Sequence, residues 1–216
     1  QLNEEYRIAI VKAGGIPIEI IPNDTFYYGI SQSNIGHHLT DDEKNDLSLI
    51  LEKCDGILMP GGYFWYDFDE YICDYALKNN IPILGICLGM QLLFEESEEY
   101  GPTPGLGLIP GKVKEIPRNL GLSVPHMGWN KNTVHHPDSA FSNVDNQYTY
   151  FVHSYYVDTD PEFITSTANY GIDVPGVVER GRVYGMQFHP EKSGVVGLNL
   201  LRAFGNITEA YAAAKQ

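Results

Sequence analysis

The sequence has few cysteines, few basic residues and no long apolar run, and each shortage excludes a class of protein. Its three cysteines, Cys54, Cys73 and Cys87, are odd in number and lack metal-binding or redox spacing, which argues against a disulfide framework and fits a reducing compartment. Lys and Arg total 14 against 28 Asp and Glu, and the net charge of −14 disfavours nucleic acid and anionic membranes as partners. No apolar run approaches the roughly 20 residues of a membrane span, and we find no charged-then-apolar leader. We therefore expect a cytoplasmic protein with neither nucleic-acid nor membrane partners.

The remaining composition is that of a globular protein. The chain has 216 residues, 43% hydrophobic and 19% charged, which is enough for a full core. We find no repeat, low-complexity tract or linker, so we expect residues 1–216 to form a single domain. His37 and His38 are adjacent but have no third ligand at a useful spacing. The sequence thus predicts neither a metal site nor a cofactor.

Segments with helical and strand patterns alternate along the first half. The predicted elements, in chain order, are a helix at 2–13, a strand at 16–22, a helix from the capping box at 40–43 to 53, a strand at 56–59, a helix at 67–80, a strand at 81–84 and a helix at 88–96. The alternation predicts an α/β fold, a doubly wound and mainly parallel sheet with helices on both faces. Because the first predicted element is a helix, we expect an N-terminal strand to be missing from the sequence.

The second half has a different texture, with Gly- and Pro-rich turns between short strands. The predicted strands are 112–116, 148–157 and 164–168, followed by a hairpin at 177–185 with its turn near Gly181. A final helix should begin near Val195 and continue beyond Phe204. We therefore expect a small antiparallel β portion beside the parallel sheet.

The segment Gly85-Ile86-Cys87-Leu88-Gly89 lies between the predicted strand 81–84 and the predicted helix 88–96. Two glycines around a cysteine at such a junction are typical of a nucleophile elbow, because they relieve crowding in a strained turn that exposes the central side chain. A thiol at a helix N-terminus is also more easily ionised. The alternative is a cysteine buried in an ordinary strand–helix turn.

His189-Pro190-Glu191 supplies the partners that a cysteine nucleophile needs. A histidine can take the proton from the thiol and return it to the leaving group, and a nearby carboxylate can orient the imidazole. The turn Pro60-Gly61-Gly62 follows another predicted strand, where backbone N–H groups can approach a reacting carbonyl closely. Each feature alone is commonly structural, but their combination is specific.

Together, Pro60-Gly61-Gly62, Gly85 to Gln91 and Gly185 to Glu191 resemble the class I glutamine amidotransferases over roughly residues 56–204. The resemblance implies that Cys87, His189 and Glu191 form a catalytic triad. It also implies an oxyanion hole made by the N–H groups of Gly62 and Leu88, and a substrate site that includes Gly61 and Gln91. The implied reaction is attack of the Cys87 thiolate on the γ-amide of glutamine, loss of ammonia and hydrolysis of the glutamyl thioester.

The second half is similar to one branch of that family, the glutaminase subunits of imidazole glycerol phosphate synthases. The similarity lies in residues 105–113, 124–130, 150–156 and 187–194. It implies that His153, Ser154 and Tyr155 lie over the glutamine site. It further implies that the segment containing His126, Trp129 and Asn130 faces a cyclase subunit, which receives the ammonia for histidine synthesis. For Trp129 the alternative is core packing.

The first half departs from that branch and leaves other functions open. It lacks the branch's Asp-Tyr-Gly-x-Gly-Asn loop, and residues 9–22 resemble the γ-glutamyl hydrolases, which cleave γ-glutamyl amides without a partner. Three hypotheses follow: a synthase glutaminase, which we prefer because its similar segments are longer, a free-standing γ-glutamyl hydrolase, and a catalytically idle binding or regulatory module.

Overall fold

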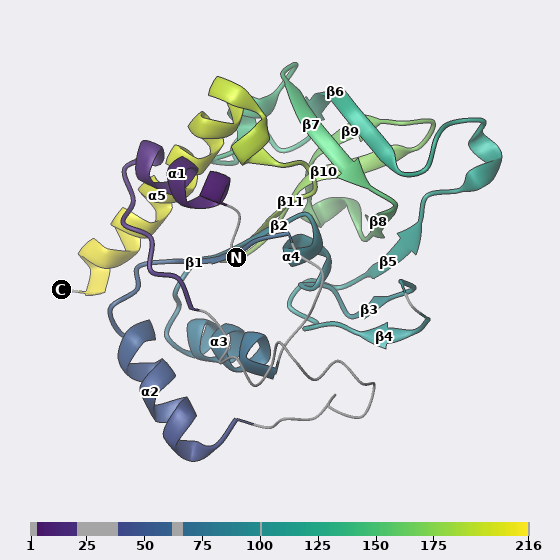
Figure 1. Cartoon of the computed structure of the whole chain (residues 1–216). Coiled ribbons are helices and arrows are strands. Elements are labelled where there is room, and N and C mark those ends of the chain that lie inside the picture. Colours follow the sequence, from purple (N-terminus) through teal and green to yellow (C-terminus); the bar gives the residue numbers. More distant parts are fainter. Residues whose placement is uncertain (1–3, 21–38, 62–66, 100, 216) are drawn as a thin grey trace.

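The computed structural model describes residues 4–20, 39–61, 67–99 and 101–215 as two β-sheets with flanking helices (Figure 1). The larger sheet has the strand order β1-β2-β11-β10-β9-β6-β7, and a four-stranded sheet has the order β4-β3-β5-β8. The strands are β1 Ile57–Met59, β2 Ile83–Ile86, β3 Glu96–Ser97, β4 Thr103–Pro104, β5 Lys112–Glu115, β6 His126–Val134, β7 Tyr148–His153, β8 Tyr155–Asp158, β9 Ile164–Asn169, β10 Asp173–Arg180 and β11 Val183–Met186. The α-helices are α1 Glu4–Ala13, α2 Asp41–Leu51, α3 Asp67–Lys78, α4 Leu88–Gln91 and α5 Gly194–Lys215.

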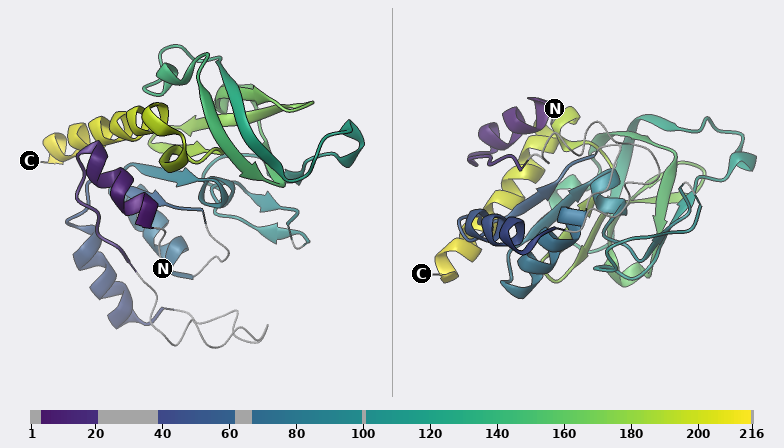
Figure 2. Two further views of the ribbon diagram at one scale, coloured as in Figure 1. Left: turned by 45° about the horizontal axis from the view of Figure 1, so that its top comes forward. Right: turned by 60° about the horizontal axis from the view of Figure 1, so that its bottom comes forward.

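The parallel strands β1, β2 and β11 are covered by helices on both faces (Figures 1 and 2). Alternate residues of β2 point to opposite faces, so Ile83 joins the core beneath α3, whereas Leu84 and Ile86 join the core beneath α1 and α5. All three side chains are fully buried. The predicted α/β class with helices on both faces of the parallel strands is confirmed.

The antiparallel portion is larger than expected. In the described part of the larger sheet, β11, β10, β9, β6 and β7 are joined by antiparallel pairings, and only β1, β2 and β11 are joined in parallel. The sequence underestimates this portion because each strand there is short, while their pairing into one sheet depends on distant contacts. The hairpin β10–β11 is confirmed, with Arg180 opposite Val183 and Gly181 at a positive φ of 61°.

The beginning of the chain agrees with the prediction only in part. The helix is confirmed as α1, and the capping box at Thr40 and Glu43 opens α2 as predicted. The predicted strand at 16–22 is wrong over the described residues 16–20, which pair with no strand in the described part of the chain. Ile16 is 91% exposed and Ile18 is 56% exposed, so their apolar side chains lie outside the core.

The helix predicted at 88–96 is wrong in its length, because α4 ends at Gln91. Backbone carbonyls that a longer helix would use instead accept hydrogen bonds from the following loop. Leu106 N donates to Leu92 O at 2.8 Å, and Leu108 N donates to Leu93 O at the same distance. The loop approaches closely because residue 105 is a glycine, where a Cβ would lie 2.1 Å from Phe94 O.

The strand predicted at 148–157 is split between the two sheets. β7 ends at His153 and pairs with β6, whereas β8 begins at Tyr155 and pairs with β5. Ser154 lies at the crossover, where its carbonyl accepts a hydrogen bond from Ile116 N at 2.9 Å. Helix α5 extends the predicted C-terminal helix to Lys215, and Figure 2 shows it beside α1.

Candidate active site

The register of the parallel strands brings three distant segments to one edge of the sheet. Met59 of β1 pairs with Gly85 of β2, and Ile86 of β2 pairs with Met186 of β11. Residues after these strands therefore lie side by side, and Cys87 N donates to Met186 O at 2.7 Å. Ligand sites in α/β sheets form at such carboxyl ends.

Cys87 occupies a strained turn between β2 and α4. Its φ of 52° and ψ of −110° are unusual for a residue with a side chain, and such strain costs of order 1–3 kcal/mol. Gly85 and Gly89 are both required here, because other backbone segments pass too close to leave room for a side chain. A Cβ on Gly85 would lie 2.4 Å from Gly89 O, and a Cβ on Gly89 would lie 2.1 Å from Met59 O. The geometry is that of a nucleophile elbow.

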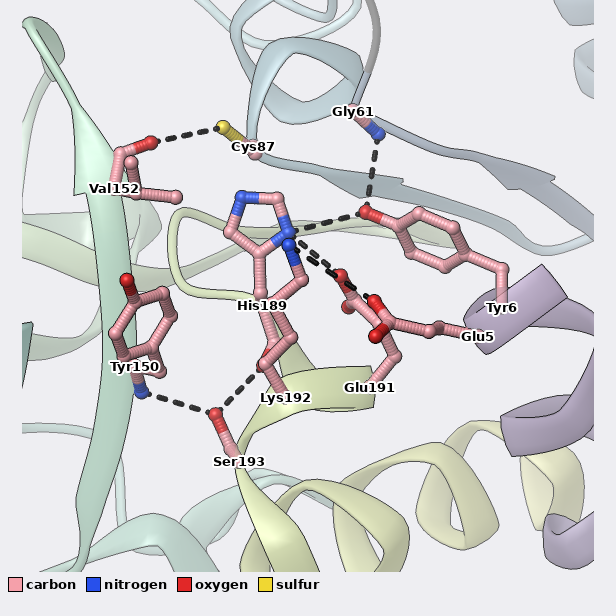
Figure 3. Close-up of polar contacts among 10 residues, drawn as sticks. All are labelled: Glu5, Tyr6, Gly61, Cys87, Tyr150, Val152, His189, Glu191, Lys192 and Ser193. Atoms are coloured by element: carbon pink, nitrogen blue, oxygen red, sulfur yellow. Dashed lines mark hydrogen bonds and ion pairs between the residues drawn. The ribbon is translucent and has the colours of Figure 1, made fainter. Parts of the chain in front are cut away.

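The imidazole of His189 lies between Cys87 and the carboxylate of Glu191 (Figure 3). Its Nδ1 donates to Glu191 Oε1 at 2.7 Å, and the Glu191 side chain is fully buried. The other ring nitrogen, Nε2, is thereby left for the thiol. Burial by itself lowers the pKa of His189, but hydrogen bonds and charge interactions with Cys87 and Glu191 outweigh it and raise this pKa to about 9. The site therefore favours an imidazolium at neutral pH.

Strand β7 fixes the backbone that carries His189. His189 N donates to Tyr150 O at 2.9 Å. The hydroxyl of Ser193 accepts from Tyr150 N at 3.0 Å and donates to His189 O at 2.7 Å, so one buried side chain joins both segments. The same strand meets the nucleophile, because Cys87 Sγ lies 3.8 Å from Val152 O. The sequence did not predict this role of Ser193. Its position four residues after His189 is the one feature of the sequence that could have indicated a contact with the His189 backbone.

Tyr6 reaches the site from α1, and sequence reasoning also missed this role. Its hydroxyl lies 3.2 Å from His189 Nδ1 and accepts a hydrogen bond from Gly61 N at 3.4 Å (Figure 3). Burial and the charge of Glu191 raise the pKa of Tyr6 well above its usual value, so it stays a neutral phenol. The spacing of apolar residues in the first segment predicts that Tyr6 lies on the buried face of a helix. It does not predict that the Tyr6 hydroxyl contacts His189.

The predicted oxyanion hole is only partly within the described residues. Gly62 lies outside them. Gly61 packs against the site, where a Cβ would lie 3.3 Å from Cys87 Cβ and 3.4 Å from His189 Cε1. The N–H of Leu88 is in the first turn of α4, whose N–H groups have no acceptor within the helix.

Gln91 lies one turn along from Cys87 and is 6% exposed. Its Nε2 donates to Tyr155 O at 2.9 Å and to Gln187 Oε1 at 3.0 Å. These two bonds use both N–H groups, so the amide offers a ligand its Oε1 acceptor. Tyr155 and Ser154 are half-buried beside it.

The side chains of two predicted site residues, His153 and His126, are buried and bonded to each other. His153 was expected to touch glutamine, but both of its ring nitrogens are engaged, by Tyr155 O at 2.6 Å and by His126 Nδ1 at 3.0 Å. His126 was expected to face a partner, but its side chain is fully buried and stacks on Phe151 and Tyr170. The paired strands β6 and β7 turn these two rings toward each other, inside the protein, and the roles in substrate and partner binding stay predictions.

The neighbouring residues on β6 lie nearer the surface. Trp129 is 54% exposed, so core packing is excluded for it, and Met127 on the same side of the strand is 61% exposed. The amide of Asn130 is turned inward, since it bonds His126 Nε2 at 2.9 Å and Asn169 O at 3.0 Å.

Within the described ranges, no helix is both long and apolar enough to cross a bilayer. Over the same ranges, no group of three or more His, Cys, Asp or Glu side chains is arranged to bind a metal ion. His37 and His38 lie outside the described residues.

The chain is similar to known proteins of one family. The profile of the glutamine amidotransferase class-I family matches residues 15–205. The imidazole glycerol phosphate synthase subunit HisH of Listeria monocytogenes is 40% identical over 174 residues, which cover 77% of this chain and 84% of the relative. The HisH subunit of Lactiplantibacillus plantarum is 54% identical over 133 residues, which cover 62% of this chain and 64% of the relative.

The fold is shared with solved structures of distant sequence. The glutaminase domain of Trypanosoma brucei CTPS superposes with a TM-score of 0.64 at 17% identity, covering 99% of this chain and 88% of that structure. The chain therefore belongs to the class I glutamine amidotransferase family, in the branch that holds the HisH subunits of imidazole glycerol phosphate synthases.

Proposed function

We propose that this protein is the glutaminase subunit of an imidazole glycerol phosphate synthase, and that Cys87, His189 and Glu191 are its catalytic triad. The observation that carries the proposal is the strained Cys87 beside a histidine whose Nδ1 is held by a buried carboxylate at 2.7 Å. Family membership and the named HisH relatives support the same activity.

The reaction begins with attack of the Cys87 thiolate on the γ-amide carbon of glutamine. The oxyanion that forms is stabilised by backbone N–H groups at Leu88 and Gly62, and each such donor is worth on the order of 10²–10³ in rate. His189 Nε2–H then protonates the leaving nitrogen, so ammonia departs and a glutamyl thioester remains. His189 next takes a proton from water, which attacks the thioester and releases glutamate.

Residues around the triad orient the substrate. The Oε1 acceptor of Gln91 suits a donor such as the α-ammonium group of glutamine, and the crossover at Ser154 and Tyr155 lies beside it, since Tyr155 O accepts a hydrogen bond from Gln91 Nε2. The ammonia passes to a cyclase subunit. Trp129 and Met127 on the outer side of β6 supply an exposed surface for that subunit, whereas Asn130 contributes from beneath it.

A free-standing γ-glutamyl hydrolase is the second candidate. It is favoured by Tyr6, which belongs to the part of the chain preceding the segments that resemble HisH and nevertheless contacts His189 and Gly61. In this reading the ammonia acceptor is absent and the leaving group is a larger amine.

Glutamate release by the full-length protein distinguishes the candidates. We would compare glutamine with a γ-glutamyl anilide, each with and without the cyclase subunit, using Cys87→Ala as the inactive control. Slow turnover of glutamine that the cyclase accelerates supports the proposal. Rapid anilide turnover that the cyclase leaves unchanged would establish the hydrolase instead. Absence of turnover, together with no labelling of Cys87 by a glutamine-like electrophile, would indicate an idle module.

A further inference from the structure

A pair of buried histidines beside the site has no place in the reaction above. His126 on β6 and His153 on β7 lie opposite each other in the strand register, and His126 Nδ1 is 3.0 Å from His153 Nε2. The ring of His126 stacks between Tyr170, with centroids 3.8 Å apart, and Phe151, with centroids 4.8 Å apart. The exposed fractions are 0% for His126 and 6% for His153. Packing therefore fixes the positions of all four ring nitrogens.

The two ring nitrogens that do not take part in the contact between the histidines, the outer nitrogens, each face an oxygen acceptor. His153 Nδ1 lies 2.6 Å from the backbone carbonyl of Tyr155. His126 Nε2 lies 2.9 Å from Asn130 Oδ1. The orientation of the Asn130 amide is set independently, because its Nδ2 donates to Asn169 O at 3.0 Å and a flipped amide would bring two oxygens together. Each outer nitrogen must therefore carry a proton.

The inner contact needs one proton as well, since two bare nitrogens 3.0 Å apart would place lone pair against lone pair. Three protons on four nitrogens exceed by one the number in two neutral imidazoles. Burial lowers the pKa of both histidines, and the charges of His126 and His189 lower the pKa of His153 further, to about 3; the hydrogen bonds to Asn130 and to Tyr155 O offset this only in part. The hydrogen bond between the two rings and the aromatic faces of Phe151 and Tyr170 favour the charge.

The pair acts on the substrate site through one carbonyl. Tyr155 O accepts hydrogen bonds from both His153 Nδ1 and Gln91 Nε2, so the position of this oxygen sets the position of the Gln91 amide. Without His126, Nε2 of His153 loses its buried partner, and the ring is no longer held in place beside the carbonyl of Tyr155. The Gln91 amide would then lose one of the two acceptors that aim its Oε1, the other being Gln187 Oε1.

We propose that His126 and His153 share one extra proton and are positioning residues that hold Tyr155 O, and through it Gln91, for binding of the γ-glutamyl substrate. The proposal rests on the proposed function for its substrate. Neither histidine touches the reacting atoms, and their effect falls on substrate binding more than on the chemical step.

The first test is kinetic and uses His126→Phe, which keeps a stacking ring between Tyr170 and Phe151 but removes both nitrogens. Thr149→Val is the matched control, because it breaks a buried 2.8 Å hydrogen bond to Asn132 on the same two strands. We expect the KM for glutamine to rise about tenfold in His126→Phe while kcat changes less than threefold. The control should keep both constants, and iodoacetamide should alkylate Cys87 at the same rate in all three proteins. An unchanged KM in His126→Phe, or an equal rise in Thr149→Val, would overturn the positioning role.

The second test counts protons directly. Nitrogen-15 NMR of histidine-labelled, full-length protein at neutral pH should show three protonated nitrogens among the four of this pair, and Asn130→Leu should reduce them to two. Two protonated nitrogens in the wild type would overturn the shared proton. The NMR count does not depend on turnover. Failure of the proposed function would instead appear as a wild type that is inactive toward both glutamine and the anilide, so the two failures can be told apart.

Discussion

Replacement of Glu191 by Gln tests how the buried carboxylate controls the histidine. Glu191→Gln conserves the shape of the side chain and removes only its charge. The wild-type carboxylate is fully buried and lies 2.7 Å from His189 Nδ1, so solvent screens the interaction weakly. The neutral amide can also turn its NH₂ group toward Nδ1, which would place the proton of the neutral imidazole on the wrong nitrogen.

The size of the effect follows from the strength of this contact. A hydrogen bond to a charged group contributes about 1.5–3 kcal/mol. One pKa unit corresponds to about 1.4 kcal/mol, so the variant should lower the His189 pKa by about 1–2 units from its value of about 9. Loss of the orienting carboxylate should also lower kcat by about 10²–10⁴-fold, the order seen when a triad loses the group that fixes its tautomer.

The assay is the pH dependence of kcat/KM for glutamate release by the full-length protein. Glu115→Gln is the control, because that carboxylate pairs with Arg118 at the surface, remote in sequence from the triad segments, and should leave the profile unchanged. Circular dichroism would verify that both variants are folded. If Glu191→Gln retained kcat within threefold of wild type with an unshifted profile, the assignment of Glu191 as the orienting group would be refuted.

Three further changes probe the elbow and the imidazolium. Cys87→Gly and Cys87→Ala should both lose turnover, but only glycine relieves the strained φ of 52°, so Cys87→Gly should be more stable to urea than Cys87→Ala by about 1–2 kcal/mol; equal stabilities would contradict the strain. Gly89→Ala should destabilise the fold by at least about 1–3 kcal/mol, because its Cβ would lie 2.1 Å from Met59 O; a wild-type melting temperature would exclude that crowding. Since the pKa of His189 is raised from 6.5 to about 9, its contribution to stability is complete below pH 6.5 and disappears as the pH rises through 9. Wild type should therefore lose about 3 kcal/mol relative to His189→Asn across that range in urea titrations, and a constant difference would argue against the raised pKa.

Local sequence determined the parts of this protein that depend on neighbouring residues. The spacing of apolar residues predicted α1 and α3, the capping box predicted the start of α2, and Gly181 predicted the hairpin turn of β10 and β11. The elbow at Cys87 was also predictable, because only glycine fits where backbones approach within van der Waals distance on both sides of it. The helix, cap and hairpin features follow from limits within a few residues of chain, whereas the glycine at 89 is required by Met59 on the neighbouring strand.

Tertiary structure decided the features that depend on residues far apart in the chain. Tyr6 and His189 are separated by 183 positions, and no periodicity indicates that they meet. The helix after Cys87 ends early because residues 105–109 take its carbonyls, which local helical propensity does not reveal. His126 and His153 were assigned to a partner and to substrate from their motifs, yet the pairing of β6 with β7 buries them against each other. Sequence thus specified which chemical groups are available, and the strand register decided which of them touch.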